Sequence, residues 1–257
     1  FLLDAELEWF DHYLKQGGTE LPRTPVRIFV MGENTWRDEQ EWPPARAARS
    51  TWYLHSDGDA AGAGGTLTGD APSDEPADTY VYDPNDPTPT RGGHDITLGG
   101  VFDQRPVEER GDVLVYTSEP FDHDVELVGP AEATLHVSTS APDTDFFVRV
   151  IDVRPDGYAH NLLEGGVRLR HRTPGTIEMV APDEVVEVTV NLWNGCHVVR
   201  AGHRLRVDIT SSDFPRFDRN ANSGLPIGSD TELHVATQTV HHDTTRPTRV
   251  VLSVIDR

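Results

Sequence analysis

Cysteine is almost absent from this sequence of 257 residues, which contains only Cys196. No disulfide can form within the chain; this usage is compatible with a reducing compartment, and we expect a cytoplasmic protein. Long apolar runs are also missing, because no stretch approaches the roughly 20 apolar residues that a membrane-spanning helix needs. The start of the chain has neither a methionine nor the basic residues and apolar run of a signal peptide. We therefore expect a piece of a longer protein that does not associate with membranes.

Basic residues are the second scarcity. Lys and Arg number 22 against 43 Asp and Glu, which gives a formal net charge of −21 at pH 7. Nucleic-acid binding needs a basic surface that displaces counterions, so this charge argues against a nucleic-acid partner. It argues equally against binding to anionic membranes. The length allows one large all-β domain or two small ones.

The sequence is rich in short alternating segments that are typical of β-strands. Four precede residue 100, at 26–31, 51–55, 66–68 and 79–82. From residue 112 the pattern is continuous, with turn residues between segments, as at Arg154-Pro155-Asp156-Gly157. This spacing predicts an all-β fold, a jelly-roll β-sandwich. The later strands are expected near 112–117, 125–129, 131–138, 145–153, 158–171, 184–192, 203–211, 231–238 and 248–255.

One α-helix is predicted before the strands, over residues 4–16. Leu3, Leu7, Phe10 and Leu14 recur at helical spacing and share one face of that helix. A single amphipathic helix ahead of a β domain needs another surface on which to bury its apolar face. The helix therefore points to a partner domain.

The segment TSSDFPRFDRNANSG, residues 210–224, is too apolar for a free loop and too polar for a core strand. It is expected to fold over the sandwich with its side chains bonded to its own backbone. Two interpretations remain open: a structural loop that closes the sandwich, or a docking surface. The residues concerned are Phe214, Pro215, Arg216, Phe217, Asp218, Asn220 and Asn222.

The spacing of Asp218, Asn220 and Asn222 matches the start of a calcium-binding loop. Such a loop requires Gly at its sixth position and Glu at its twelfth, where this chain has Ser223 and Ser229. A self-bonded turn is the preferred interpretation, and no metal or cofactor is expected.

Other candidate ligands and nucleophiles are interpreted as structural. His241 and His242 are adjacent, so their side chains point to opposite faces of a strand and seldom share a metal. His197 and His203 are read as isolated residues. Cys196 is expected to be a small buried residue beside a turn at 193–195.

Several ordered motifs resemble one known family. The segment Ser211–Gly224 is similar to the SSxFPRFDRNxNTG signature in the C-terminal domain of the cocaine esterase-like and X-Pro dipeptidyl-peptidase hydrolases. The segments 26–43, 103–120, 141–157 and 202–207 match the same family in the same order, so the resemblance covers nearly the whole chain. Residues 8–15 resemble the end of the last helix of that family's catalytic α/β-hydrolase domain.

The resemblance implies that residues 1–18 are the terminal helix of a missing catalytic domain. Residues 19–48 would be a linker with the first strand, and residues 49–257 a galactose-binding-like jelly roll. The nucleophile of such hydrolases lies in a Gly-x-Ser-x-Gly turn, and this chain contains no such pentapeptide. We expect an accessory domain without catalytic residues, whose partner is the catalytic α/β-hydrolase domain.

The resemblance also implies that the loop at residues 92–99, before the DQRP motif, reaches the mouth of the substrate pocket. His94, Asp95, Ile96 and Thr97 are the candidate pocket residues there. An exposed loop without substrate contact is the alternative.

The tryptophans leave further interpretations open. Trp36 and Trp42 are close in sequence and are expected to pack against the sheet or to dock a neighbouring domain. Together with Trp52 and Trp193, they could instead form the sugar-binding platform of a free-standing carbohydrate-binding jelly roll. A purely structural oligomerisation domain, as in a homodimer, is a third interpretation.

Overall fold

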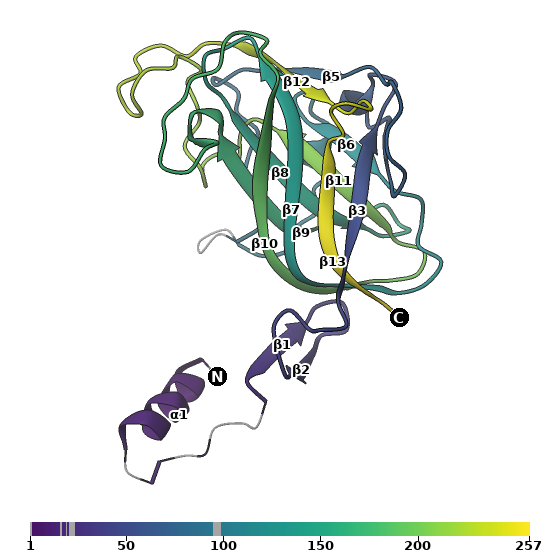
Figure 1. The fold of residues 1–257 in the computed structure, drawn as a ribbon, viewed down its shortest axis with the longest axis vertical. Helices are drawn as coiled ribbons and strands as arrows, with labels where there is room; N and C mark the ends of the chain where they lie inside the picture. The colour runs from purple at the N-terminus through teal and green to yellow at the C-terminus, as the bar shows by residue number, and fades with distance from the viewer. Residues whose placement is uncertain (1, 16, 19, 21–23, 95–98) are drawn as a thin grey trace.

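The computed structural model describes residues 2–15, 17–18, 20, 24–94 and 99–257. The predicted all-β jelly-roll sandwich is confirmed, and Figure 1 shows it as a tall body of strands above a small hairpin and one helix. In the described part of the chain, no helix combines the length and apolar character needed to cross a lipid bilayer.

One folded-over sheet forms the two layers of the sandwich. Its strand order is β5-β12-β7-β13-β3-β4-β6-β11-β8-β9. Strands β12 and β13 pair with successive parts of one edge of β7, and β10 pairs with the opposite edge. The short strand β4 pairs with β3 on one side and with β6 on the other, so it joins the layers. The strands are β3 (Ala48–His55), β4 (Gly65–Thr68), β5 (Asp78–Tyr82), β6 (Leu114–Thr117), β7 (Val125–Thr139), β8 (Asp145–Val153), β9 (Ala159–Arg168), β10 (Val186–Val199), β11 (Arg204–Thr210), β12 (Ala236–His241) and β13 (Arg249–Asp256).

The core lies between these layers and follows the period-two pattern of strands. Leu135 and Val137 of β7, Val188 and Val190 of β10, and Val207 of β11 are buried there. The helical elements around the sandwich are short: η1 (Ala60–Gly62), α2 (Arg105–Glu108) and η2 (Leu169–His171).

A separate two-stranded hairpin precedes the sandwich, formed by β1 (Val26–Val30) and β2 (Thr35–Glu39). Backbone hydrogen bonds at Met31 attach it to β10. Glu126 of β7 is 1% exposed and accepts hydrogen bonds from Arg37 of the hairpin and Arg257 at the end of β13, each at 2.9 Å. Burial raises the pKa of Glu126, but the two arginines outweigh it and hold the pKa below its usual value. This carboxylate therefore joins three parts of the chain.

The helix α1 (Leu2–Leu14) lies apart from the sandwich, with the hairpin between them (Figure 1). It is shifted two residues towards the N-terminus relative to the prediction. Its apolar face is uncovered: Leu3, Leu7, Phe10 and Leu14 are 73%, 61%, 50% and 76% exposed.

Several details of the strand prediction were wrong. The segments 125–129 and 131–138 form one strand, β7, which continues through Gly129 and Pro130. The expected strand 231–238 begins only at Ala236, because residues 231–235 belong to the preceding irregular segment. The turn expected at 193–195 is a bulge inside β10. Strand β2 was missed because its five residues are mostly polar and do not alternate between buried and exposed positions.

Candidate functional site

The first half of the 210–224 segment pairs with the irregular loop that follows β5. Phe214 donates its backbone N–H to the Thr88 carbonyl at 3.0 Å and accepts from Thr90 N at 2.7 Å. Arg216 N donates to Thr90 Oγ1 at 3.2 Å. These bonds fix the backbone while Phe214, Pro215, Phe217 and Asp218 remain exposed. The neighbouring loop, rather than the segment's own side chains, therefore holds this half, which presents an exposed apolar surface.

The second half of the segment turns inward. Asn220 Nδ2 donates to Asp143 Oδ2 and Asp145 Oδ1, both at 2.8 Å, and Asn220 Oδ1 accepts from Asn222 N at 2.9 Å. Asn222 Nδ2 donates to the His234 carbonyl at 2.7 Å. The bond from Asn222 N to Asn220 Oδ1 is the expected bonding of a side chain to the segment's own backbone. Over the described residues, no group of three His, Cys, Asp or Glu side chains is arranged to hold a metal ion.

The predicted pocket loop has a closed neck. Gly93 and Gly100 exchange two backbone hydrogen bonds, of 2.8 and 3.0 Å. Gly93 has a φ of +86°, and a Cβ there would collide with the Glu164 carboxylate. His94 N donates to Glu164 Oε1 at 2.8 Å. Glycine is therefore required at this position by both conformation and space.

The far side of the neck is held by two amide side chains. Asn161 Oδ1 accepts from Phe102 N at 2.8 Å, and Asn161 Nδ2 donates to the Gly100 carbonyl at 3.2 Å. Gln104 Nε2 donates to the Arg91 carbonyl at 2.8 Å. The neck is thus fastened to β9, while Asp95, Ile96 and Thr97 lie outside the described residues.

Glu164 of β9 connects the loop neck to the 210–224 segment. It forms an ion pair with Arg216, whose guanidinium also lies 3.8 Å from Asp213. Asp213 pairs in turn with Arg149 at 2.9 Å, and both of these side chains are buried. Burial raises the pKa of Glu164, but hydrogen bonds from His94 and the charge of Arg216 outweigh it and lower the pKa. Glu164 is therefore an ionised, paired carboxylate at neutral pH.

A cavity of about 440 Å³ opens beside this chain of ion pairs, lined by His94, Trp193, Asn194 and Arg216. The bulge in β10 places Trp193 at its rim, where the side chain is 62% exposed. Trp42 Nε1 donates to Asn194 Oδ1 at 3.2 Å. The cavity thus brings together the pocket loop, the 210–224 segment and tryptophans that sequence analysis had treated separately.

The remaining tryptophans lie in different surroundings. Trp36 and Phe29 meet edge to face within the hairpin, with ring centroids 5.3 Å apart, and the guanidinium of Arg27 lies 5.7 Å from the Trp36 ring. Trp52 packs against the core and lies 5.8 Å from Phe121. Trp52 is thus a core residue rather than part of an open platform.

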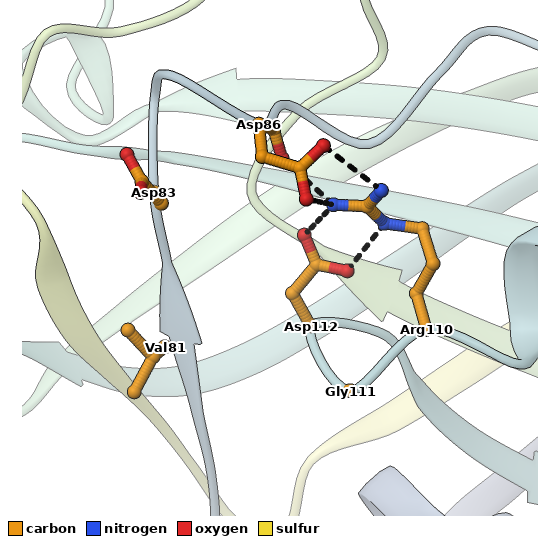
Figure 2. Close-up of a pocket in the computed structure, with 6 residues that line it drawn as sticks. All are labelled: Val81, Asp83, Asp86, Arg110, Gly111 and Asp112. Carbon is orange, nitrogen blue, oxygen red and sulfur yellow. Dashed lines mark hydrogen bonds and ion pairs between the residues drawn. The ribbon is translucent and has the colours of Figure 1, made fainter.

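A second hollow, of about 310 Å³, lies beside the loop that follows β5 and is drawn in Figure 2. Arg110 crosses it and donates to Asp112 Oδ1 at 2.7 Å and to the Asp86 carbonyl at 2.7 Å (Figure 2). Its guanidinium is occupied by partners from the chain itself. The hydrogen bonds of Arg110 thus support the loop in which Thr88 and Thr90 pair with Phe214.

The interpretation of His197 and His203 as isolated was wrong. His197 Nε2 lies 2.9 Å from Asp152 Oδ2, and His203 Nδ1 lies 2.7 Å from Asp152 Oδ1. The ring of His160 is 5.1 Å from that of His197, and burial lowers the pKa of His160 to about 4. These residues come from four neighbouring segments, and no local sequence pattern could have shown that they meet.

Comparison with known proteins shows which hydrolases this chain is related to. The chain is 40% identical over 261 residues to cocaine esterase from Rhodococcus sp., an alignment that covers 97% of this chain and 45% of that protein. It is 30% identical to a putative serine esterase of Mycobacterium tuberculosis, over 83% of this chain and 37% of that protein. The chain therefore spans less than half the length of these relatives.

Solved structures give the same result. An aminopeptidase from a Thaumarchaeota archaeon superposes with a TM-score of 0.86 at 31% identity, covering 99% of this chain and 44% of that one. An α-amino acid ester hydrolase superposes with a TM-score of 0.83 at 28% identity, covering 96% of this chain and 44% of that one. The family model of the X-Pro dipeptidyl-peptidase C-terminal non-catalytic domain matches residues 21–251. The chain belongs to this family of C-terminal, non-catalytic hydrolase domains.

Proposed function

We propose that this chain is the accessory C-terminal part of a serine hydrolase, that it stabilises the catalytic α/β-hydrolase domain and that it walls one side of the substrate pocket. The catalytic domain would cleave an ester or an X-Pro amide through an acyl-serine intermediate. In this proposal residues 1–18 belong structurally to the catalytic domain, residues 19–48 are the connection, and residues 49–257 are the accessory sandwich.

The uncovered helix α1 carries the proposal. Leu7 and Leu14 are 61% and 76% exposed on one face of a helix that lies away from the sandwich (Figure 1). A helix of this length is marginal in water without tertiary packing. Burying an apolar side chain of this size stabilises a contact by roughly 1.5–3 kcal/mol. A catalytic domain that covers this face would supply that stabilisation.

The pocket role is supported by the neck of the 92–99 loop. Residues 91–94 and 99–104 are held by Glu164, Asn161 and Gln104, so a side chain carried by the loop would be presented from a fixed base. A rigid base is what a wall of a substrate pocket needs, because small misplacements cost much of the rate.

Split-protein complementation tests the proposal. The 257-residue chain, a separately produced upstream catalytic segment, and their mixture are assayed on a chromogenic short-chain ester and an X-Pro anilide. We expect no activity from the chain alone and a gain in activity or in its thermal half-life upon mixing. Serine-inhibitor-sensitive activity from the chain alone, or a catalytic segment indifferent to the chain, would refute it.

Two matched variants test the helix contact. Leu7→Glu places a carboxylate on the apolar face, whereas Ala5→Glu places the same group on the opposite face. Leu7→Glu should raise the chain concentration needed for half-maximal complementation by at least about tenfold. Ala5→Glu should leave that concentration unchanged.

A carbohydrate-binding function is the second candidate, because Trp193 is 62% exposed beside a cavity with polar side chains. Sugars stack on such exposed aromatic rings. Titration of the tryptophan fluorescence with a panel of glycans tests it: a saturable change that is lost in Trp193→Ala would favour this candidate.

A further inference from the structure

Strand β10 contains a strained bulge at Trp193, opposite the irregular Gly129-Pro130 segment of β7. Its register against β7 shifts between Asn191 and Asn194, and Trp193 between them has a φ of +66°. A residue with a Cβ rarely adopts this left-handed conformation, because the Cβ approaches the backbone carbonyl. Asn191 Oδ1 accepts the Trp193 N–H at 2.8 Å and so stabilises the turn of the chain.

The bulge is held rigidly from behind. Gly165 of β9 lies against the Asn191 carbonyl so closely that a Cβ there would collide with it, and Gly195 lies beside the Leu163 side chain, which a Cβ would approach to 2.9 Å. From the side of the hairpin, Trp42 Nε1 donates to Asn194 Oδ1 at 3.2 Å. The indole is therefore presented from a fixed backbone.

The strained conformation of Trp193 contributes little packing inside the domain. Leu192 next to the bulge is fully buried in the core, whereas Trp193 is 62% exposed. Strained backbone tends to persist at functional sites. Tryptophan, with tyrosine and arginine, is enriched among the few residues that carry most of the binding energy of protein–protein contacts.

The surroundings of Trp193 suit a surface that becomes covered. The adjacent cavity is lined by His94, Asn194 and Arg216, and the charge of Arg216 is already paired with Glu164. Covering the cavity would thus leave no arginine newly unpaired, which avoids the main cost of burying charge.

The connection to α1 reaches the same strand. Met31, directly after β1, donates to the Cys196 carbonyl at 3.0 Å and accepts from Val198 N at 2.9 Å. The hairpin that follows the helix is therefore fastened to β10 a few residues beyond Trp193. A body bound to α1 would lie next to this hairpin. Trp193 adjoins the segment after the hairpin through the Trp42–Asn194 hydrogen bond, and it adjoins the loop neck through the cavity that it shares with His94.

We propose that Trp193 is the anchor of the contact with the catalytic α/β-hydrolase segment, inserting its indole into an apolar recess of that partner. The inference rests on the proposed accessory function and names the residue through which docking acts. The partner corresponds to the part of the related hydrolases that this chain does not span, since the chain covers 45% of cocaine esterase.

The first measurement separates docking from internal packing. In the 257-residue chain, Trp193→Gly removes a mostly exposed side chain and also relieves the positive φ, so the melting temperature should stay within about 3 °C of wild type. Trp193→Ala keeps the strain and should melt below the glycine variant. A loss of more than about 5 °C in Trp193→Gly would assign Trp193 to internal packing and overturn the proposal.

The second measurement is complementation of the separate catalytic segment. Trp193→Gly and Trp193→Ala should each raise the chain concentration for half-maximal activity by about 10- to 30-fold. Ile177→Ala is the matched control, since Ile177 is 69% exposed outside this region, and should behave as wild type. If the Trp193 variants complement like wild type, the anchor is refuted while the accessory function stands. If the wild-type chain itself fails to complement, both are refuted.

Discussion

The ion pair between Glu164 and Arg216 is predicted to be the energetic link between the pocket loop and the 210–224 segment. Glu164→Gln keeps an oxygen for the His94 N–H, bonded at 2.8 Å, but removes the charge opposite Arg216. The side chains of Glu164 and Arg216 are 11% and 14% exposed, so Arg216 would be left largely buried with only the more distant Asp213, at 3.8 Å, as an ionic partner.

The magnitude follows from that burial. Removing one partner of a fully buried pair costs about 3–5 kcal/mol, and slight solvent access reduces this to about 2–4 kcal/mol. Arg216→Met should cost a similar amount. The double variant leaves no unpaired charge and should recover at least about 1 kcal/mol relative to the sum of the single variants.

Urea unfolding of the chain, followed by circular dichroism at pH 7, measures the four free energies of unfolding. The exposed pair of Arg49 and Glu132 is the control, because a solvated pair contributes only about 0–1 kcal/mol. Additive single variants, or a loss below about 1 kcal/mol for Glu164→Gln, would refute the link.

Three further predictions concern stability. Burial raises the pKa of Asp208 well above its usual value, so the folded state keeps a proton that the unfolded carboxyl releases above about pH 4. Wild-type stability should therefore fall relative to Asp208→Asn by about 1.4 kcal/mol per pH unit until the folded pKa is reached, and parallel curves between pH 5 and 7 would contradict this. Gly93→Ala should destabilise the chain by more than about 1 kcal/mol and speed proteolysis of the 92–99 loop, whereas Gly69→Ala, with its nearest neighbour 4.0 Å away, should change both little. Burial lowers the pKa of His242, but its hydrogen bond to Asp78 and the charge of Asp78 outweigh burial and raise the pKa. The stability that this pair contributes is therefore lost as pH rises through the raised pKa of His242. In chemical denaturation, His242→Gln should flatten this dependence of stability on pH.

Periodicity allowed most of the fold to be predicted, because a strand with one buried face shows its pattern locally. It failed where the pattern was not local. Strand β7 is buried on both faces along much of its length and continues through Pro130, which in isolation favours a break. The Trp193 bulge was mistaken for a turn, since polar residues and a glycine resemble a turn in the sequence alone.

The candidate site was predicted only in its separate parts. His94 and Arg216 were named, but Glu164, which lies between them, was not, because strand register brings it there and the sequence does not reveal register. The same reason hid the meeting of His197 and His203 at Asp152. The exposed face of α1 was foreseen because four apolar residues at helical spacing are a local signal.

Glu126 has a consequence for the geometry of the whole assembly. Its carboxylate binds Arg37 of the hairpin and Arg257 at the end of β13, so it fixes the hairpin to the sandwich. A contact of this kind sets the angle between the hairpin and the sandwich as well as their distance. A domain that docks on the hairpin would therefore take its orientation relative to the sandwich from this single buried carboxylate.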